Sequence, residues 1–259
     1  MLLAIDVGNS KTLIGIFKGK KIISRMRFST AAIGKTNFSS FLKKKLQEKN
    51  IKSEGIKGII IASVVPLTTA PLSKALKSIC QVRPLQAGPN LKLGLRLGYR
   101  NPHHLGQDRL ANAVAAFHLY GGPIIIVDYG TATTICFISR SGYYKGGIIL
   151  PGLEMMAWAL ARKTALLPYL RTLNRPKRLI GQDTKESIVS GLVYGLTEMV
   201  DGLIKKIKKK VKGRVKVMAT GGVASFLFPY SKEIEKVDAD LTLKGLRLIY
   251  EMNKPIFKT

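Results

Sequence analysis

Residues 4–17 read AIDVGNSKTLIGIF, an apolar run that carries an aspartate, breaks at Gly-Asn-Ser-Lys-Thr and becomes apolar again. Gly8 and Asn9 are residue types that tolerate a tight or left-handed turn, so the stretch predicts two strands joined by a hairpin. A buried carboxylate needs a compensating partner, and Asp6 would lie beside the backbone N–H groups and hydroxyls of the turn. Such a turn can bind phosphate, but an ordinary hairpin with a polar tip explains the same residues.

A second stretch, IVDYGTATTICFI at 126–138, repeats the first. Asp128 takes the place of Asp6, and Gly130 takes the place of Gly8. Both stretches begin as apolar runs, turn through a short Gly/Thr/Ser segment and continue as β-prone sequence. The chain therefore contains two copies of one predicted three-stranded unit.

Further strands and helices alternate along the chain. Apolar runs at 58–65 and 216–224 predict one later strand in each half. Alternation of strands with helices predicts an α/β fold, and 259 residues allow two domains, which we place at 1–118 and 119–259. Helical patterns are found at 39–50, 68–79, 106–119, 153–163, 184–210 and 240–252.

The chain is strongly basic, with 43 Lys and Arg against 15 Asp and Glu and a net charge of +28. Such a charge suits acidic partners: nucleic acid, an anionic membrane or phosphorylated small molecules. The lysines concentrate at 42–50 and 203–216, and in the second stretch apolar residues recur at helical spacing. We therefore expect a core-packed helix with a solvated lysine face. Because no aromatic side chains are interleaved there to stack bases, specific nucleic-acid binding is not expected.

The sequence also bears on the cellular compartment. Apolar runs such as 59–62 and 124–127 are far too short to cross a bilayer, and the amino terminus enters a predicted strand at once, without a signal peptide. Cys80 and Cys136 lie far apart and show no metal-ligand spacing, so we expect reduced, buried thiols. These features predict a cytoplasmic protein without a membrane partner.

The duplicated hairpin, with Asp-x-Gly followed by Asn or Thr, resembles the actin-like ATPase and sugar-kinase superfamily. That superfamily has duplicated ribonuclease-H-like (actin-like) domains with a cleft between them, where two facing hairpin tips hold phosphates and metal. Over nearly its whole length the chain more specifically resembles the type III pantothenate kinases. The motifs that carry this resemblance are DVGNSKT (6–12), SVVP (63–66), NPHHLGQDRLANAVAA (101–116), VDYGTATT (127–134), GGIILPGLE (146–154), TALLP (164–168), GQDTKESIVSGLVYG (181–195), ATGG (219–222) and LTLKGLRLIYEMN (241–253).

This resemblance implies an enzyme that uses ATP to phosphorylate pantothenate to 4'-phosphopantothenate, the first step of coenzyme A biosynthesis. It implies that ATP acts with Mg²⁺ or another divalent cation and that K⁺ or NH₄⁺ is also required. It further implies a homodimer whose substrate pocket lies at the subunit interface, with pantothenate and ATP as the small-molecule partners.

The resemblance also implies roles for individual residues. Asp108, in GQDR, would be the catalytic base, whereas composition alone favours a capping or dipole role for an aspartate at a predicted helix start. Asp6 would bind the divalent metal of ATP through water, and Asp128 would bind the monovalent cation. Gly221 and Gly222 are weaker nucleotide-site candidates, because a structural turn explains them equally well. The other implied contacts are Val7, Gly8, Asn9, Ser10, Lys11, Thr12 and Thr131 for ATP, and Tyr99, Gly106, Gln107, Arg109 and Thr184 for pantothenate, with Asp6 and Asp108 belonging to the same two sets.

The first hairpin departs from the family pattern at one position. Members usually read Asp-x-Gly-Asn-Thr-Asn-Thr, where this chain has Ser10 and then Lys11. Lys11 is not the lysine of a Walker A motif, because the glycine pattern and the following helix of that motif are both missing. It either reaches a phosphate oxygen or points to solvent.

Two alternatives belong to other functional classes. A ribonuclease-H-like nuclease would use the same fold, strand-borne aspartates and a basic surface, but duplicated Gly/Thr hairpins suit a nucleotide cleft better. A non-catalytic, kinase-like accessory regulator is the second alternative. The presence of Asp6, Asp108, Asp128 and Arg109 favours an active enzyme over that regulator.

Overall fold

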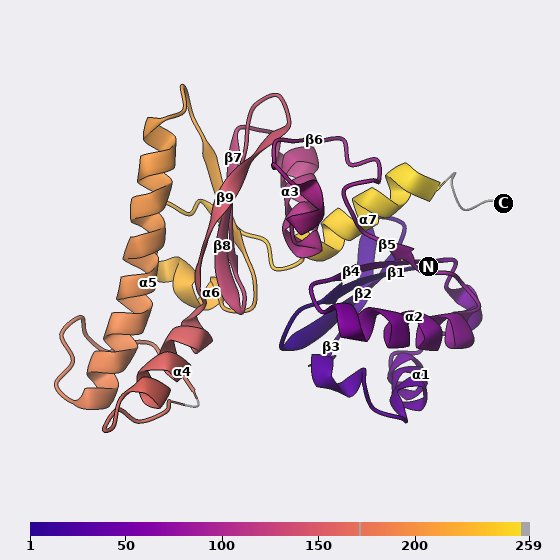
Figure 1. Cartoon of the computed structure of the whole chain (residues 1–259), viewed down its shortest axis with the longest axis horizontal. Coiled ribbons are helices and arrows are strands. Elements are labelled where there is room, and N and C mark those ends of the chain that lie inside the picture. Colours follow the sequence, from indigo (N-terminus) through magenta and orange to yellow (C-terminus); the bar gives the residue numbers. More distant parts are fainter. Residues whose placement is uncertain (171, 255–259) are drawn as a thin grey trace. The chain divides into compact units, whose positions relative to one another are not determined.

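The computed structural model of the chain describes residues 1–170 and 172–254 (Figure 1). By spatial packing these residues form two compact units. Unit 1 combines Met1–Tyr120 with the chain from Asp240 onward, and unit 2 is Gly121–Ala239. That the chain folds as two domains at 1–118 and 119–259 stays a prediction. The last helix, Leu241–Asn253, lies beyond residue 119 in sequence but packs with unit 1.

Unit 1 is built on a sheet of five strands in the order β3-β2-β1-β4-β5. The first hairpin is antiparallel, with Asp6 opposite Leu13, and β1 pairs in parallel with β4. Its strands are β1 (Leu2–Val7), β2 (Lys11–Lys18), β3 (Lys21–Ser29), β4 (Gly58–Ser63) and β5 (Leu85–Gln86), with the short β6 (Arg96–Leu97) following; its helices are α1 (Phe38–Glu48), α2 (Pro66–Cys80), α3 (Gln107–Tyr120) and α7 (Leu241–Asn253).

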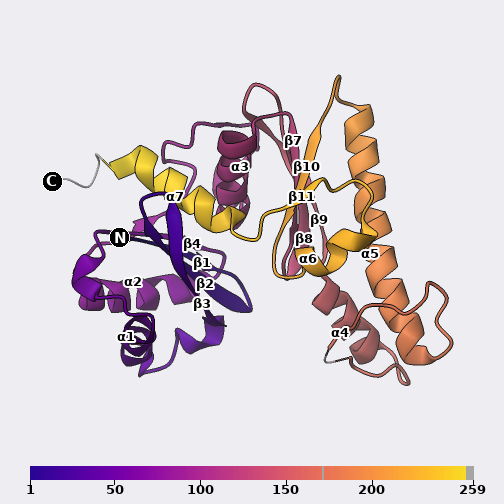
Figure 2. The same ribbon diagram turned by 180° about the vertical axis from the view of Figure 1, so that it is seen from behind.

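Helices cover both faces of the unit 1 sheet, as both views show (Figures 1 and 2). Leu3, Ile5 and Val7 alternate along β1 and are fully buried in the core that α1 and α2 complete. Burial of one such side chain contributes about 1.5–3 kcal/mol. The opposite face carries small residues, and a Cβ at Gly15 would lie 2.7 Å from Leu243 of α7. Small residues on this face therefore let α7 lie close to the strands.

Unit 2 repeats the same plan. Strands β11, β10, β7, β8 and β9 follow one another in the sheet, with β7–β8 and β8–β9 antiparallel and β10 parallel to β7. The strands are β7 (Ile124–Tyr129), β8 (Ala132–Ile138), β9 (Tyr143–Pro151), β10 (Lys216–Thr220) and β11 (Lys236–Val237); the helices are α4 (Leu153–Lys163), α5 (Thr184–Lys209) and α6 (Ala224–Leu227). The α/β prediction and the duplication of the ribonuclease-H-like unit are thereby confirmed.

Helix α5 runs along the unit 2 sheet in both views (Figures 1 and 2). Its apolar stripe, which includes Leu196, Val200 and Ile204, is fully buried in the unit 2 core, as the helical spacing predicted. Within the described residues it is also the one helix long and apolar enough to cross a bilayer. Half of its most apolar stretch, however, is buried inside the protein. Its lysine-rich final turns remain largely exposed.

Two strand predictions extend too far. The strand expected over 58–65 ends at Ser63, and α2 begins at Pro66. The strand expected over 216–224 ends at Thr220, because Gly221 adopts a φ of +101° that breaks the extended backbone. The predicted helices agree with the observed ones to within two residues at each end.

Candidate functional site

The first hairpin turn is held by a hydroxyl that lies outside the quoted motif. Thr30 donates its side-chain hydrogen bond to the Gly8 carbonyl at 2.7 Å, and its backbone N–H bonds the Ser10 carbonyl at 3.1 Å. The hydroxyls of Thr30 and Thr12 lie 3.0 Å apart, and Thr12 is fully buried. Sequence analysis missed Thr30, because its relation to the turn is visible only when β3 has paired with β2.

The remaining residues of this turn divide into a buried and an exposed set. Val7 is fully buried and Asp6 is half-buried at the carboxyl end of β1, whereas Asn9, Ser10 and Lys11 are exposed. The Gly8 N–H bonds the Lys11 carbonyl at 3.1 Å, and a Cβ at Gly8 would lie 3.0 Å from that carbonyl. A braced backbone with exposed polar side chains is an arrangement that can receive phosphate oxygens without further reorganisation.

A second polar cluster forms at the start of α3, also in unit 1. Asp108 accepts a hydrogen bond from the Arg109 N–H at 2.8 Å, and the Gln107 side chain accepts one from the Ser63 N–H at 2.8 Å. The second bond ties the helix start to the carboxyl end of β4. A Cβ at Gly106 would lie 2.5 Å from the Asp108 carboxylate, so glycine leaves room for that carboxylate.

Burial raises the pKa of Asp108 above its ordinary value, and the N–H and the charge of Arg109 only partly offset this effect. Arg109 itself is only 6% exposed, and its guanidinium carbon lies 5.9 Å from the centre of the Tyr99 ring. A proton-accepting carboxylate, a buried cation and an aromatic face thus lie within one short segment of structure. This cluster can orient an anionic substrate and take a proton from its hydroxyl.

The second hairpin, in unit 2, is packed against two glycines. A Cβ at Gly221 would lie 2.5 Å from the Asp128 carboxylate and 2.6 Å from the Tyr129 backbone. Gly152 bonds the Thr131 carbonyl through its N–H at 3.1 Å, and a Cβ there would collide with the same carbonyl. Close packing therefore explains Gly221, whereas Gly222 is exposed with open space around it. Sequence analysis missed Gly152.

Asp128 is half-buried near the end of β7, and Thr131 is exposed in the turn. Thr184 is the exposed first residue of α5. The preceding residue, Asp183, caps that helix by accepting a hydrogen bond from the Glu186 N–H at 2.8 Å. Unit 1 therefore contains Asp6–Thr12 together with the Tyr99 and Gly106–Arg109 cluster, and unit 2 contains Asp128, Thr131 and Thr184. In residues 1–170 and 172–254, no three His, Cys, Asp or Glu side chains converge as a metal-binding group.

Comparison with known proteins identifies both a family and a fold. The family model for type III pantothenate kinase matches residues 2–206. A Campylobacter jejuni protein assigned to the Baf family of transcriptional activators is 21% identical, with a TM-score of 0.62 and coverage of 98% of this chain and 99% of that one. The activator of 2-hydroxyisocaproyl-CoA dehydratase from Clostridium difficile, solved with ADPNP, is 14% identical, with a TM-score of 0.59 and coverage of 99% and 97%. At these identities the structural likeness shows the fold alone.

Proposed function

Because the chain belongs to the type III pantothenate kinase family, we infer that it phosphorylates pantothenate with ATP, in the first step of coenzyme A biosynthesis. The observation that carries this conclusion is the match over residues 2–206, which includes both hairpins and the cluster at the start of α3. The matched family is one of kinases, and neither a nuclease nor a non-catalytic regulator gains support from it. A coupled assay of ADP release tests the conclusion directly.

The start of α3 supports a role in binding the phosphoryl acceptor. Asp108 would accept the proton of the pantothenate hydroxyl as that oxygen attacks the γ-phosphate. Arg109 would bind the anionic end of the substrate, since its guanidinium is permanently charged and forms paired hydrogen bonds with a carboxylate. Tyr99, Gly106 and Gln107 would complete these contacts, and Thr184 is a further candidate for contact with pantothenate.

The first hairpin supports a role in binding ATP. Its braced turn offers the hydroxyl of Ser10, the amide of Asn9 and the ammonium group of Lys11 to the phosphates. Thr131 of the second hairpin is a further candidate for contact with ATP. Val7, Gly8 and Thr12 would act through the backbone, because Val7 and the Thr12 side chain are buried. Mg²⁺ bound to ATP supplies positive charge to the transferring phosphate. Asp6 is the residue that would hold that ion through water.

The second hairpin supports a monovalent-cation role for Asp128. Gly221 lies against both the Asp128 carboxylate and the Tyr129 backbone, and oxygen atoms of carboxylates and carbonyls are the ligands that hard cations prefer. We expect turnover in K⁺ to exceed turnover in Na⁺. Steady-state rates measured in the two salts at equal ionic strength check this, and Asp128→Asn should remove most of the difference. Equal turnover in both salts would contradict the role of Asp128.

An exposed apolar surface on unit 2 supports the homodimer. Helix α4 and the segment between α4 and α5 carry large apolar side chains that are 43–90% exposed. Exposed apolar side chains that are grouped along one part of a chain are candidates for a protein–protein interface. We call these residues the α4 surface and propose that a second copy of the chain covers it. They are Met155, Trp158, Leu166, Tyr169, Leu179 and Ile180.

Trp158 lies on α4 and is 52% exposed, so we expect Trp158→Glu to weaken dimerisation by about 10²-fold or more, as loss of a buried aromatic anchor does. Sedimentation velocity over a range of concentrations measures this shift. Ile23→Glu is the matched control, because Ile23 is 42% exposed on β3 in unit 1. A monomeric wild type, or equal dimerisation of both variants, would show that the α4 surface is not the interface.

We further propose that the enzyme works in the cytoplasm without a membrane or a specific nucleic-acid partner. The lysines at the end of α5 lie on its solvent side and lack neighbouring aromatic residues in sequence, so they offer phosphate contacts but no base readout. A binding titration with a random DNA duplex at physiological salt tests this. Tight binding there would contradict it.

A further inference from the structure

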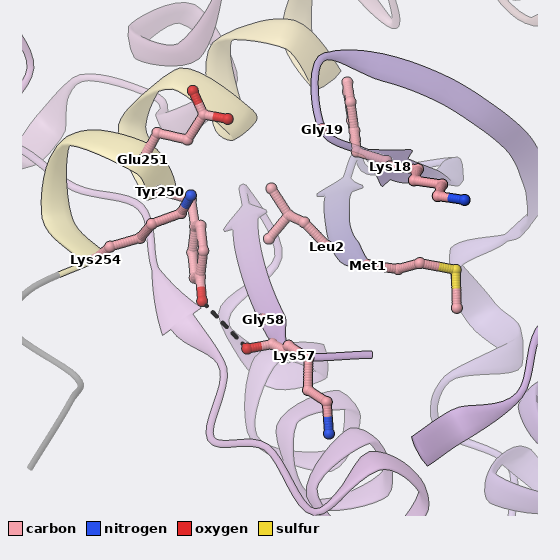
Figure 3. Close-up of a pocket in the computed structure, with 10 residues that line it drawn as sticks. Met1, Leu2, Lys18, Gly19, Lys57, Gly58, Tyr250, Glu251 and Lys254 are labelled. Carbon is pink, nitrogen blue, oxygen red and sulfur yellow. Dashed lines mark hydrogen bonds between the residues drawn. The ribbon is translucent and has the colours of Figure 1, made fainter. Parts of the chain in front are cut away.

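A pocket of unit 1 (Figure 3) lies at the start of β1, whereas the first hairpin turn follows the end of that strand. Its volume is about 420 Å³, within the range of small-molecule sites. Residues at the starts of β1 and β4, at the end of β2 and in the last turn of α7 line it. The first hairpin turn, which is the candidate phosphate site, follows the carboxyl end of β1. The pocket therefore lies at the opposite end of this strand and is separate from the candidate ATP-binding residues of the turn.

The walls of this pocket are apolar and aromatic. Leu2 and Phe17 lie on paired strands, and Phe17 is 1% exposed. The ring of Tyr250 forms the α7 side, and its hydroxyl bonds the Lys57 carbonyl at 3.4 Å (Figure 3). A Cβ at Gly58 would collide with that hydroxyl. Glycine at this position therefore allows the aromatic ring to lie against the strand end.

The pocket is also strongly positive. Lys18, Lys57 and Lys254 are exposed members of its lining, and none of the three forms an ion pair within the part of the chain that the structure describes. The acidic member of the lining is Glu251, whose carboxylate bonds the Arg247 guanidinium at 2.7 Å. The ammonium groups of these exposed lysines point in different directions (Figure 3), so they surround the pocket with positive charge rather than form one fixed anion site. Positive charge next to an apolar wall is complementary to a ligand with an apolar body and an anionic group.

We propose that this pocket binds a small organic anion whose flat apolar body lies against Tyr250 and Leu2 and whose negative charge is attracted by the exposed lysines of the lining. Strand β1 runs from Leu2 at the pocket to Asp6, about 13 Å along the strand. Strand β4 runs from Gly58 to Ser63, which is bonded to Gln107 beside Asp108. Of the two strands that begin at the pocket, β1 thus leads to Asp6 and β4 leads to the polar cluster at the start of α3.

Anilinonaphthalene sulfonate is a suitable probe, because it combines a flat apolar body with one sulfonate. The full-length protein, labelled with ¹³C in its methionine methyl groups, is titrated with the probe and observed by NMR. Met1 lines the pocket, whereas Met155 and Met156 lie on α4, so the spectrum separates the pocket from the α4 surface. We expect saturable movement of the Met1 resonance that persists when ADP is present in excess.

Charge reversal then tests the lysines. Lys18→Glu/Lys57→Glu should raise the dissociation constant measured at Met1 by about tenfold or more, and Tyr250→Ala should weaken binding similarly. Lys20→Glu/Lys52→Glu is the matched control, since these lysines are exposed in the same unit but do not line the pocket. It should change the constant by less than about threefold. A Met1 resonance that does not move, displacement of the probe by ADP, or equal effects of the two double variants would overturn the proposal.

Discussion

Asp108→Asn is expected to lower kcat by about 10²- to 10⁴-fold, the usual range for loss of a general base. Asp108 accepts a hydrogen bond from the Arg109 N–H at 2.8 Å. Asparagine has the same shape and keeps an oxygen that can accept this bond. The substitution removes only the group that accepts the substrate proton. The affinity for ATP and the melting temperature should therefore change little, as binding and calorimetric measurements can show.

The pH profile adds an independent readout. Burial raises the pKa of Asp108, and a base must be ionised to accept a proton. The rate constant kcat of the wild type should consequently rise with pH through a value above the ordinary aspartate pKa of about 3.9, whereas the residual rate of Asp108→Asn should lack that step.

Asp240→Asn is the matched control for Asp108→Asn, because Asp240 also stands at a helix start in unit 1, bonds the Arg25 guanidinium and is not among the proposed substrate contacts. Its kcat should remain close to that of the wild type. Near-normal turnover of Asp108→Asn, with only a lowered melting temperature, would instead assign Asp108 a role in helix capping.

Arg109→Met is expected to raise the KM for pantothenate by about 10- to 10²-fold, the cost of losing a hydrogen bond to a charged group. Methionine fills much of the space of a side chain that is only 6% exposed, so the change tests the charge more than the packing. The KM for ATP should stay within about threefold of the wild type. Steady-state kinetics with each substrate varied in turn measure both constants.

Arg109→Lys provides the control for charge without the planar guanidinium. It should give an intermediate KM for pantothenate, because an ammonium group cannot form the paired hydrogen bonds of arginine. If Arg109→Met binds pantothenate as tightly as the wild type, the buried guanidinium serves the packing against Tyr99 and not the substrate.

The two hairpins and most helix positions could be predicted because their signals are local. Glycine marks each turn, the apolar runs mark the strands, and helical spacing marks the buried face of α5. The residues that hold the two turns in place could not be predicted in this way, because they are distant from the turns in sequence. Thr30 reaches the first turn only through the pairing of β3 with β2, and Gly152 meets Thr131 only after β9 has returned along β8.

The packing of α7 illustrates the same limit at a larger scale. Its sequence predicts a helix at 240–252, and the structure confirms the helix at Leu241–Asn253. The surface that it packs on includes Gly15 and Gly58, which lie about 200 residues away in sequence and leave space for Leu243 and Tyr250. Periodicity specifies that a face is buried, but the shape of the opposite surface decides where.

Pantothenate-dependent release of ADP is the most direct test of the central claim. The purified full-length chain is assayed with ATP, Mg²⁺ and K⁺ in a coupled assay, with and without pantothenate, and the product is identified by mass spectrometry. The account predicts ADP release that requires pantothenate and equals the amount of 4'-phosphopantothenate formed, and it predicts the loss of both in Asp108→Asn. The account would be contradicted by ADP release that does not depend on pantothenate, or by a folded protein that forms no 4'-phosphopantothenate under these conditions.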